Sequence, residues 1–280
     1  MPSWGPAPDL PAYFRRIGYE GPVTPSLEVL RELHRLHAAG IPFENLAAFL
    51  GEPIALDVPS LEDKLVRARR GGWCFEQNLL FARVLEAIGY PVRRLGARVR
   101  WNAPAGYVGP RSHMLLEVAI QGAPWLADVG FGGQSLTAPL RLEAGPEQET
   151  PHETFRLAAE DEHFVLEALL EGEWRALYAF DLVPQQLADY EVSNWYLAHH
   201  PRSHFVTGLV AARAAPGKRH ALRNTRYTIH HRDGRTERRT LASLAELRSV
   251  LEGDLAIPLP GDARLDERLE QLVREEREGQ

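Results

Sequence analysis

Residues 70–78 read Arg70-Gly71-Gly72-Trp73-Cys74-Phe75-Glu76-Gln77-Asn78, and they carry the single cysteine of the chain. From Phe75 to Ile88 apolar residues recur every three or four positions before Gly89 and Pro91, so the spacing predicts a helix over 74–88. From Val92 the apolar period changes to two, which is typical of strands. The stretch therefore opens the last helix of a helical N-terminal part, directly before a part built of sheet.

The segments before residue 70 contain three further helix signals. Asp9 can cap a helix over 10–17 that Gly18 ends, and Pro25-Ser26 opens another over 27–40. A third helix is expected to begin at Ser60. Four helices with short connections predict a helical N-terminal unit.

The segments after residue 91 predict a sheet followed by a mixed C-terminal part. Six short strand candidates, separated by turn residues, lie at 92–101, 114–120, 125–129, 155–157, 164–170 and 174–178. Their regular spacing favours a small barrel or a sandwich. Strands over 222–232 and 235–241 flank Asp233-Gly234, a strong hairpin signal. A helix from Ser243 to Leu251 and a last amphipathic helix through Leu272 are expected to follow.

The composition excludes several classes of function. The 280 residues are 44% hydrophobic and 25% charged, as in an ordinary globular protein. A net charge of −6 argues against binding to nucleic acid or to an anionic membrane surface. One cysteine excludes an intrachain disulfide and a multi-cysteine metal site. Because the N-terminus lacks a leader pattern and no long charge-free apolar stretch occurs, we expect a cytoplasmic protein.

Cys74 is a candidate nucleophile, although a lone cysteine is in most proteins a small buried hydrophobe. Two glycines deliver it to the first turn of a predicted helix, where the dipole and free backbone N–H groups favour the thiolate. A nucleophile also needs a base and an orienting group. His113 and Asp128 fit these roles by type, and a carboxylate within the apolar stretch around Asp128 is costly unless it is paired.

Strand register alone does not bring His113 and Asp128 together. A hairpin turning over residues 121–124 would place Glu117 opposite Asp128. The two side chains would meet only if the chain bends at Ser112-His113 or if the strands curve around a barrel. The histidine doublets 199–200 and 230–231 lack metal-site spacing, so no metal is expected.

Several motifs resemble, in order along the chain, those of the arylamine N-acetyltransferase family. They are Ile41-Pro42-Phe43-Glu44-Asn45-Leu46, residues 70–78, Ser112-His113 and Asp128-Val129-Gly130-Phe131-Gly132. The later segments Asn194-Trp195-Tyr196 and Pro201-Arg202-Ser203-His204-Phe205 resemble that family as well, so the similarity runs from about residue 10 to residue 250.

The resemblance implies an α+β fold with a cysteine-protease or transglutaminase-like core. Residues 1–89 would form a helical bundle carrying the nucleophile, residues 90–195 an antiparallel β-barrel carrying His and Asp, and residues 196–280 an α/β lid. It also implies a catalytic triad of Cys74, His113 and Asp128.

The implied activity is transfer of an acetyl group from acetyl-CoA, through a Cys74 thioester intermediate, to an arylamine or hydrazine nitrogen, with ping-pong kinetics and a role in xenobiotic metabolism. Partners would be these small molecules, without nucleic acid or membrane. Phe43, Trp73 and Phe131 would line the substrate pocket, unless they are ordinary core residues. Tyr196 and Ser203 are the candidates for coenzyme A contacts.

Glu44 and Arg70 would form a structural clamp, as the corresponding pair does in the family. Two alternative functions use the same triad. One is an amide synthase of natural-product assembly that takes acyl groups from a carrier. The other is a cysteine hydrolase or transglutaminase-type enzyme, which shares the order of Cys, His and Asp. A ligand-binding relative without activity would require a broken triad, and all three positions are intact.

Overall fold

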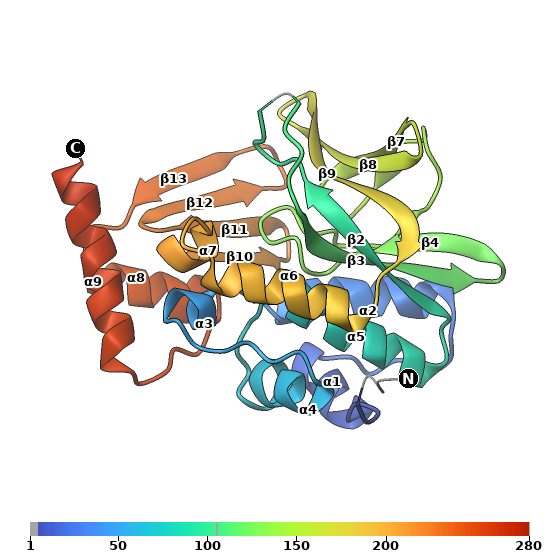
Figure 1. Cartoon of the computed structure of the whole chain (residues 1–280), viewed down its shortest axis with the longest axis horizontal. Coiled ribbons are helices and arrows are strands. Elements are labelled where there is room, and N and C mark those ends of the chain that lie inside the picture. Colours follow the sequence, from blue (N-terminus) through green and yellow to red (C-terminus); the bar gives the residue numbers. More distant parts are fainter. Residues whose placement is uncertain (1–4, 105, 280) are drawn as a thin grey trace.

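The computed structural model describes residues 5–104 and 106–279, and Figure 1 shows their arrangement. In the N-terminal part the helices are α1 (Leu10–Ile17), α2 (Leu27–Gly40), α3 (Leu46–Phe49), α4 (Val58–Leu61) and α5 (Cys74–Ile88), with a π-helical turn at Glu62–Arg67. In the C-terminal part they are α6 (Leu187–His199), α7 (His204–Thr207), α8 (Leu244–Ser249) and α9 (Ala263–Glu278), with a second π-helical turn at Val250–Asp254.

Most predicted helices are confirmed, with one start corrected. The helices at 10–17, 27–40 and 74–88 have the predicted bounds. The helix expected at Ser60 begins earlier, because the carboxylate of Asp57 caps it by accepting from the Ser60 N–H. The sequence does not predict helix α6, since its exposed residues Val192 and Trp195 are themselves apolar and hide the periodicity.

A barrel-like antiparallel sheet fills the middle of the chain. Among the described residues its strand order is β5-β4-β3-β2-β9-β8-β7-β6. The strands are β2 (Val92–Val99), β3 (Arg111–Ile120), β4 (Ala123–Ala127), β5 (Leu140–Arg141), β6 (Gln148–Glu149), β7 (Thr154–Glu160), β8 (His163–Leu170) and β9 (Glu173–Pro184). This confirms the barrel rather than the sandwich, and the α+β class.

A second antiparallel sheet lies beside the first, with the order β1-β10-β11-β12-β13. Its strands are β1 (Phe43–Glu44), β10 (Val210–Ala215), β11 (Lys218–Arg223), β12 (Arg226–His231) and β13 (Thr236–Thr240). The predicted strand over 222–232 is wrong, because a turn at Asn224, whose φ is 53°, separates β11 from β12. The hairpin at Asp233-Gly234 is confirmed.

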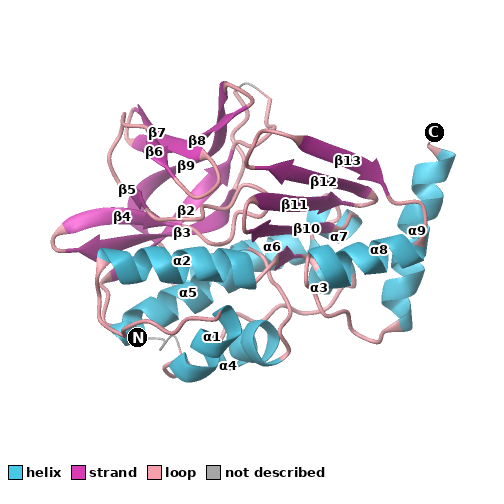
Figure 2. Cartoon of the chain, turned by 180° about the vertical axis from the view of Figure 1, so that it is seen from behind, coloured by secondary structure: helices cyan, strands magenta, loops and turns pink. Residues whose placement is uncertain are grey.

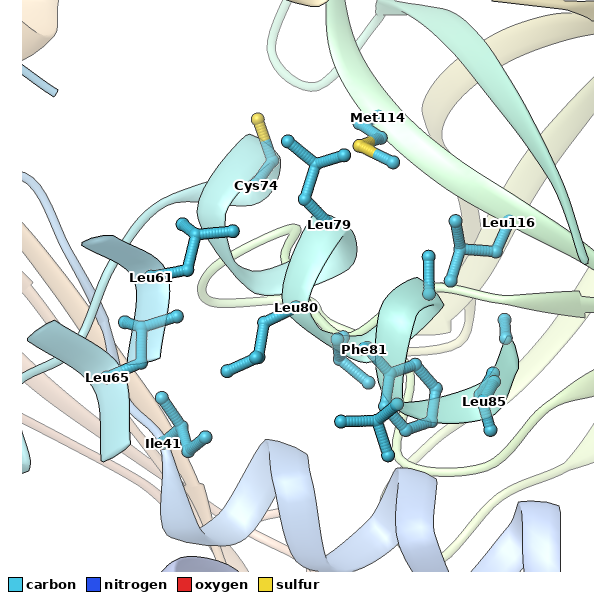
Figure 3. Packing of buried hydrophobic residues seen from close by; sticks show 14 of the residues in the cluster. Ile41, Leu61, Leu65, Cys74, Leu79, Leu80, Phe81, Leu85, Met114 and Leu116 are labelled. Carbon is cyan, nitrogen blue, oxygen red and sulfur yellow. The ribbon is translucent and has the colours of Figure 1, made fainter. Parts of the chain in front are cut away.

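Among residues 5–104 and 106–279, the two sheets and the helices share three apolar cores. One lies between the N-terminal helices and the barrel-like sheet, and Figure 3 shows its residues around α5. A second fills the interior of the barrel-like sheet, around Leu115 and Phe155. The third packs α8 and α9 against the second sheet and includes Leu46 and Phe49 from α3. Figure 2 shows α2 and α5 along one side of the barrel-like sheet, with α1 and α4 beyond them on the side away from that sheet.

N-terminal residues therefore belong to the C-terminal sheet and its core. Strand β1 pairs with β10, and the predicted division at residue 195 falls inside α6. No helix among the described residues is long and apolar enough to span a membrane.

The turn between β3 and β4 sets the register that matters for the candidate site. Gln121 and Gly122 have φ values of 50° and 78°, the type I′ geometry of a two-residue hairpin. Because Ile120 pairs with Ala123, continuing the ladder would place Asp128 opposite Leu115 rather than Glu117. This corrects the predicted register by two residues and makes His113 the diagonal neighbour of Asp128 on the same face.

We expect Gly122→Ala to lower the free energy of unfolding by about 1 kcal/mol, because an L side chain is strained at positive φ. Gly253→Ala is the matched control. Gly253 lies in a helical turn, and a methyl group added to it would point into open space, so alanine there should be neutral or stabilising by up to about 1 kcal/mol. Urea unfolding of the two variants measures both effects. Equal losses would contradict the turn geometry.

Candidate active site

Residues 70–73 lead to the start of α5, and at Gly71 and Gly72 the surrounding atoms leave room only for glycine. A Cβ at Gly71 would lie 2.7 Å from Cγ of Glu44, and one at Gly72 would lie 2.9 Å from Cδ2 of Leu65. Backbone hydrogen bonds join Gly72 to Pro42 and to Glu44, both at 3.2 Å. The glycines therefore serve close packing of the backbone beside β1, since neither has a positive φ.

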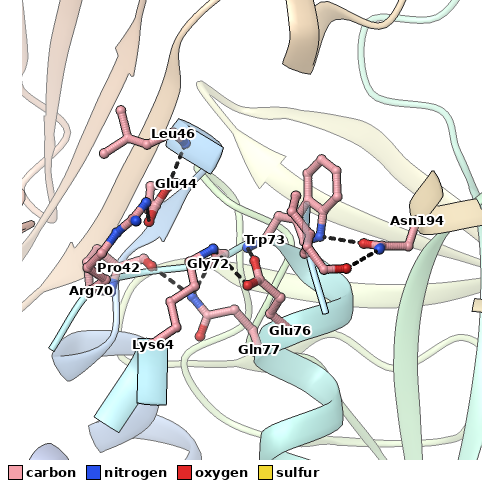
Figure 4. Close-up of polar contacts among 11 residues, drawn as sticks. Pro42, Glu44, Leu46, Lys64, Arg70, Gly72, Trp73, Glu76, Gln77 and Asn194 are labelled. Atoms are coloured by element: carbon pink, nitrogen blue, oxygen red, sulfur yellow. Dashed lines mark hydrogen bonds and ion pairs between the residues drawn. The ribbon is translucent and has the colours of Figure 1, made fainter. Parts of the chain in front are cut away.

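Two ion pairs hold residues 70–73 in place (Figure 4). Arg70 meets Glu44 at 3.0 Å, and the other carboxylate oxygen of Glu44 accepts from the Leu46 N–H at 2.6 Å. The predicted clamp residues are thus in contact. On the opposite side, Lys64 meets Glu76 at 2.7 Å. The sequence does not predict this second pair, although Glu76 lies three residues after Trp73, the spacing of a capping box.

Glu76 also fixes the first turn of α5. Its carboxylate accepts from the Trp73 N–H at 3.1 Å. Burial raises the pKa of Glu76, while the charge and hydrogen bond of Lys64 oppose that shift. The carboxylate thus links the N-terminus of α5 to the π-helical turn that holds Lys64.

Cys74 is the first residue of α5 and is 6% exposed. In Figure 3 its sulfur points away from the apolar side chains Leu80 and Ile41. The Sγ atom lies 3.7 Å from the carbonyl oxygen of Ser112, directly before His113. The sulfur therefore sits at the positive end of a helix and next to the strand that carries the histidine.

His113 and Asp128 are in direct contact and almost fully buried. The Nε2 atom of His113 lies 2.7 Å from Oδ2 of Asp128. Burial alone would lower the pKa of His113, but the charge and hydrogen bond of Asp128, together with a hydrogen bond to Cys74, raise it to about 10. The pKa of Asp128 is lowered despite its burial, because His113 faces it. Both pKa shifts favour the charged forms, an imidazolium facing a carboxylate, and Asp128 engages the Nε2 atom of His113 rather than its Nδ1 atom.

Three further donors surround the carboxylate of Asp128. The hydroxyl of Tyr178, on β9, donates to Oδ2 at 2.9 Å. The Asn78 side-chain amide and the Gly130 N–H both donate to Oδ1 at 2.9 Å. Asn78 lies one helical turn after Cys74, so Asp128 is tied to the helix that carries the sulfur.

Tyr178 and His34 take part in the site without having been candidates in the sequence. The sequence around Tyr178 does not mark it as a site residue, because a tyrosine in an apolar strand is typical of the core. His34, on α2, accepts from the Asp128 N–H at 3.1 Å, and burial lowers the pKa of His34 to about 4. His34 is therefore a neutral acceptor that holds the backbone of Asp128.

The three predicted pocket residues lie in different surroundings. The ring of Phe131 is 5.0 Å from that of His113 and is partly exposed. Phe43 packs against Phe205 at 6.1 Å between ring centres. Trp73 is buried, and its indole N–H donates to Asn194 of α6 at 3.0 Å (Figure 4). Of the three, Phe131 is the one whose ring covers the histidine.

The predicted coenzyme A contacts lie on α6 and at the start of α7. Tyr196 is exposed and stacks on His200 with 4.5 Å between ring centres. Ser203 is buried, and its hydroxyl donates to the Leu197 carbonyl at 2.6 Å while capping α7. Within the described part of the chain, neither residue has a polar contact with the triad. The same part of the chain holds no cluster of three metal-ligating side chains.

Comparisons with known proteins agree on one family. A family model described as N-acetyltransferase matches residues 26–264. Arylamine N-acetyltransferase from Mycolicibacterium smegmatis is 43% identical over 257 residues, which cover 90% of this chain and 93% of that protein. The Escherichia coli arylamine N-acetyltransferase is 44% identical, covering 88% and 87%. The Mycobacterium marinum arylamine N-acetyltransferase structure in complex with CoA has a TM-score of 0.91 at 42% identity, covering 94% and 99%.

We expect Gly130→Ala to disturb the site, because a Cβ there would lie 2.7 Å from Cα of Cys74 and 2.9 Å from the Asn78 amide. The variant should lose about 1 to 3 kcal/mol of stability and change the rate at which iodoacetamide modifies Cys74. Gly133→Ala is the control, since its Cβ would meet nothing closer than 3.9 Å. Urea unfolding and timed alkylation test both, and identical behaviour of the two variants would refute the close packing at Gly130.

Proposed function

The chain belongs to the arylamine N-acetyltransferase family, and from that premise we propose that it moves an acetyl group from acetyl-CoA to an arylamine or hydrazine through a thioester on Cys74. The observation that carries this proposal is the buried contact between His113 and Asp128, beside a sulfur at a helix N-terminus. The CoA complex of the Mycobacterium marinum relative supports acetyl-CoA as the donor.

In the first half-reaction, the Cys74 thiolate attacks the carbonyl carbon of acetyl-CoA. A bond forms between Sγ and that carbon, the bond from the carbon to the coenzyme A sulfur breaks, and the leaving thiolate takes a proton from the His113 imidazolium. Asp128 holds the imidazole through Nε2, which leaves Nδ1 to exchange the proton.

In the second half-reaction, the amine nitrogen attacks the acetyl carbon on Cys74. The nitrogen gives its proton to the neutral His113, the bond from carbon to Sγ breaks, and the thiolate and imidazolium are restored together. Because both substrates use one sulfur in turn, the kinetics are ping-pong. Phe131, which covers His113, helps to keep water from the thioester.

Intact-protein mass spectrometry tests the thioester. Mixing with acetyl-CoA should add one acetyl group, and an aromatic amine should then remove it. Cys74→Ser should take up none, since a serine hydroxyl has almost no ionised fraction at neutral pH. Ser112→Ala, which keeps the carbonyl beside the sulfur, is the control and should still be acetylated. An acetylated Cys74→Ser protein would overturn the assignment, and loss of the acetyl group to water alone would indicate a hydrolase.

The pH dependence of alkylation tests the ion pair. Because the pKa of His113 is raised to about 10, its positive charge is present at lower pH and is lost as the pH rises through that value. Iodoacetamide should therefore modify the wild-type protein rapidly already at mildly acidic pH, where a free thiol reacts slowly. In His113→Asn the rate should rise with pH as for a free thiol, near about pH 8.5.

His163→Asn, which changes an exposed histidine on β8, is the control and should keep the wild-type profile. Coinciding profiles for the wild type and His113→Asn would rule out the thiolate–imidazolium mechanism.

A further inference from the structure

Three arginines from distant parts of the sequence converge on a pocket that none of the triad residues lines. Arg16 comes from the end of α1, Arg69 from the segment before α5, and Arg213 from β10. The pocket has a volume of about 310 Å³ and is also lined by Glu252, Ala256 and Pro258. It thus lies where the N-terminal helices meet the second sheet.

None of these three arginines has a carboxylate partner among the described residues. Arg16, which is 7% exposed, donates to the carbonyl oxygens of Leu65, Gly40 and Arg69 at 2.8, 2.6 and 3.1 Å. Arg213 donates to the carbonyl of Ala39 at 2.9 Å. These carbonyls accept hydrogen bonds from the guanidinium groups but carry no formal negative charge to balance them.

The nearby acidic side chains are paired with other cations. Glu252, which lines the pocket, meets Arg248 at 3.2 Å, and Asp254 meets Arg239 at 3.8 Å. Burial, followed by the charges of Arg69 and Arg213, lowers the pKa of Arg16 to about 10. At neutral pH all three guanidinium groups are charged, and they repel one another around a common space.

We infer that this pocket binds a phosphate group, held by Arg16, Arg69 and Arg213. A guanidinium has five N–H donors in a planar fork that matches a phosphate oxyanion, and the carbonyl contacts of Arg16 and Arg213 leave donors to spare. The volume lies at the lower end of the range for ligand pockets, which suits a phosphate ester as well as the free ion.

The pocket is coupled to the approach to Cys74 through the backbone. Arg69 has a φ of 56°, its carbonyl accepts from Arg16, and the next residue, Arg70, forms the clamp with Glu44. A phosphate that neutralises Arg69 and Arg16 would hold this segment and stabilise the folded protein. Binding of inorganic phosphate at this site does not depend on the proposed acetyl transfer.

Thermal unfolding with inorganic phosphate, at constant ionic strength set with potassium chloride, tests the site. Phosphate should raise the melting temperature of the wild-type protein saturably. Arg69→Gln should weaken this response at least about tenfold in phosphate concentration, because one charged donor is lost. Arg69 is suitable because its side chain is exposed and has no polar contact in the described structure.

Two matched variants separate binding from damage to the fold. Arg15→Gln removes an exposed arginine from the same helix as Arg16 and should leave the response unchanged. Glu252→Gln removes the negative charge that lines the pocket and should strengthen the response, which a mere structural lesion would not do. No saturable shift in the wild type, or an equal shift in Arg69→Gln, overturns the site.

A second experiment identifies the source of the phosphate. Its design rests on the proposed function, in which acetyl-CoA is the donor. It compares binding of coenzyme A with that of dephospho-coenzyme A, which lacks the 3′-phosphate. If Arg69→Gln abolishes the affinity difference between them, the pocket takes the phosphate of the donor. If only the response to inorganic phosphate is lost, the pocket takes a separate phosphate. Either result supports the site, whereas acetylation of Cys74 tests the proposed function on its own.

Discussion

Asp128 is ionised in a position without solvent exposure, and much of the surrounding structure follows from this constraint. A buried carboxylate costs several kcal/mol unless charge and hydrogen bonds replace the lost water. His113 supplies the charge, while Tyr178, Asn78 and the Gly130 N–H supply the hydrogen bonds. Removing any one of these partners would leave part of the charge uncompensated, so their positions are fixed together.

These partners come from helix α5 and from three parts of the barrel-like sheet. Asn78 lies on α5, His113 on β3 and Tyr178 on β9, and the Gly130 N–H follows β4. Asn78 also donates to the Met114 carbonyl at 2.7 Å and accepts from the Val129 N–H at 3.1 Å. The helix that begins at Cys74 is thereby joined to the sheet, which explains how a sulfur on one element stays in register with an imidazole on another.

The sequence predicted the helices and strands better than it predicted the side-chain contacts between them. Periodicity and caps located the helix at 74–88, and residue types alone selected Cys74, His113 and Asp128 as candidates. Their contact depends on a two-residue turn at Gln121-Gly122, which lacks the usual Asn-Gly signal and led to the wrong register. Tyr178 and His34 could not be predicted, because their roles arise from tertiary packing and both resemble ordinary core residues in the sequence.

Residues 70–73, which lead to Cys74, are held in place by ion pairs as well as by close packing. Arg70 is paired with Glu44, Lys64 is paired with Glu76, and the chain between them passes through two glycines because no side chain fits. A buried ion pair adds little net stability, but an unpaired member costs about 3 to 5 kcal/mol, so each pair opposes any displacement of the segment. The sulfur of Cys74 is therefore positioned from both sides by ion pairs that do not themselves contact it.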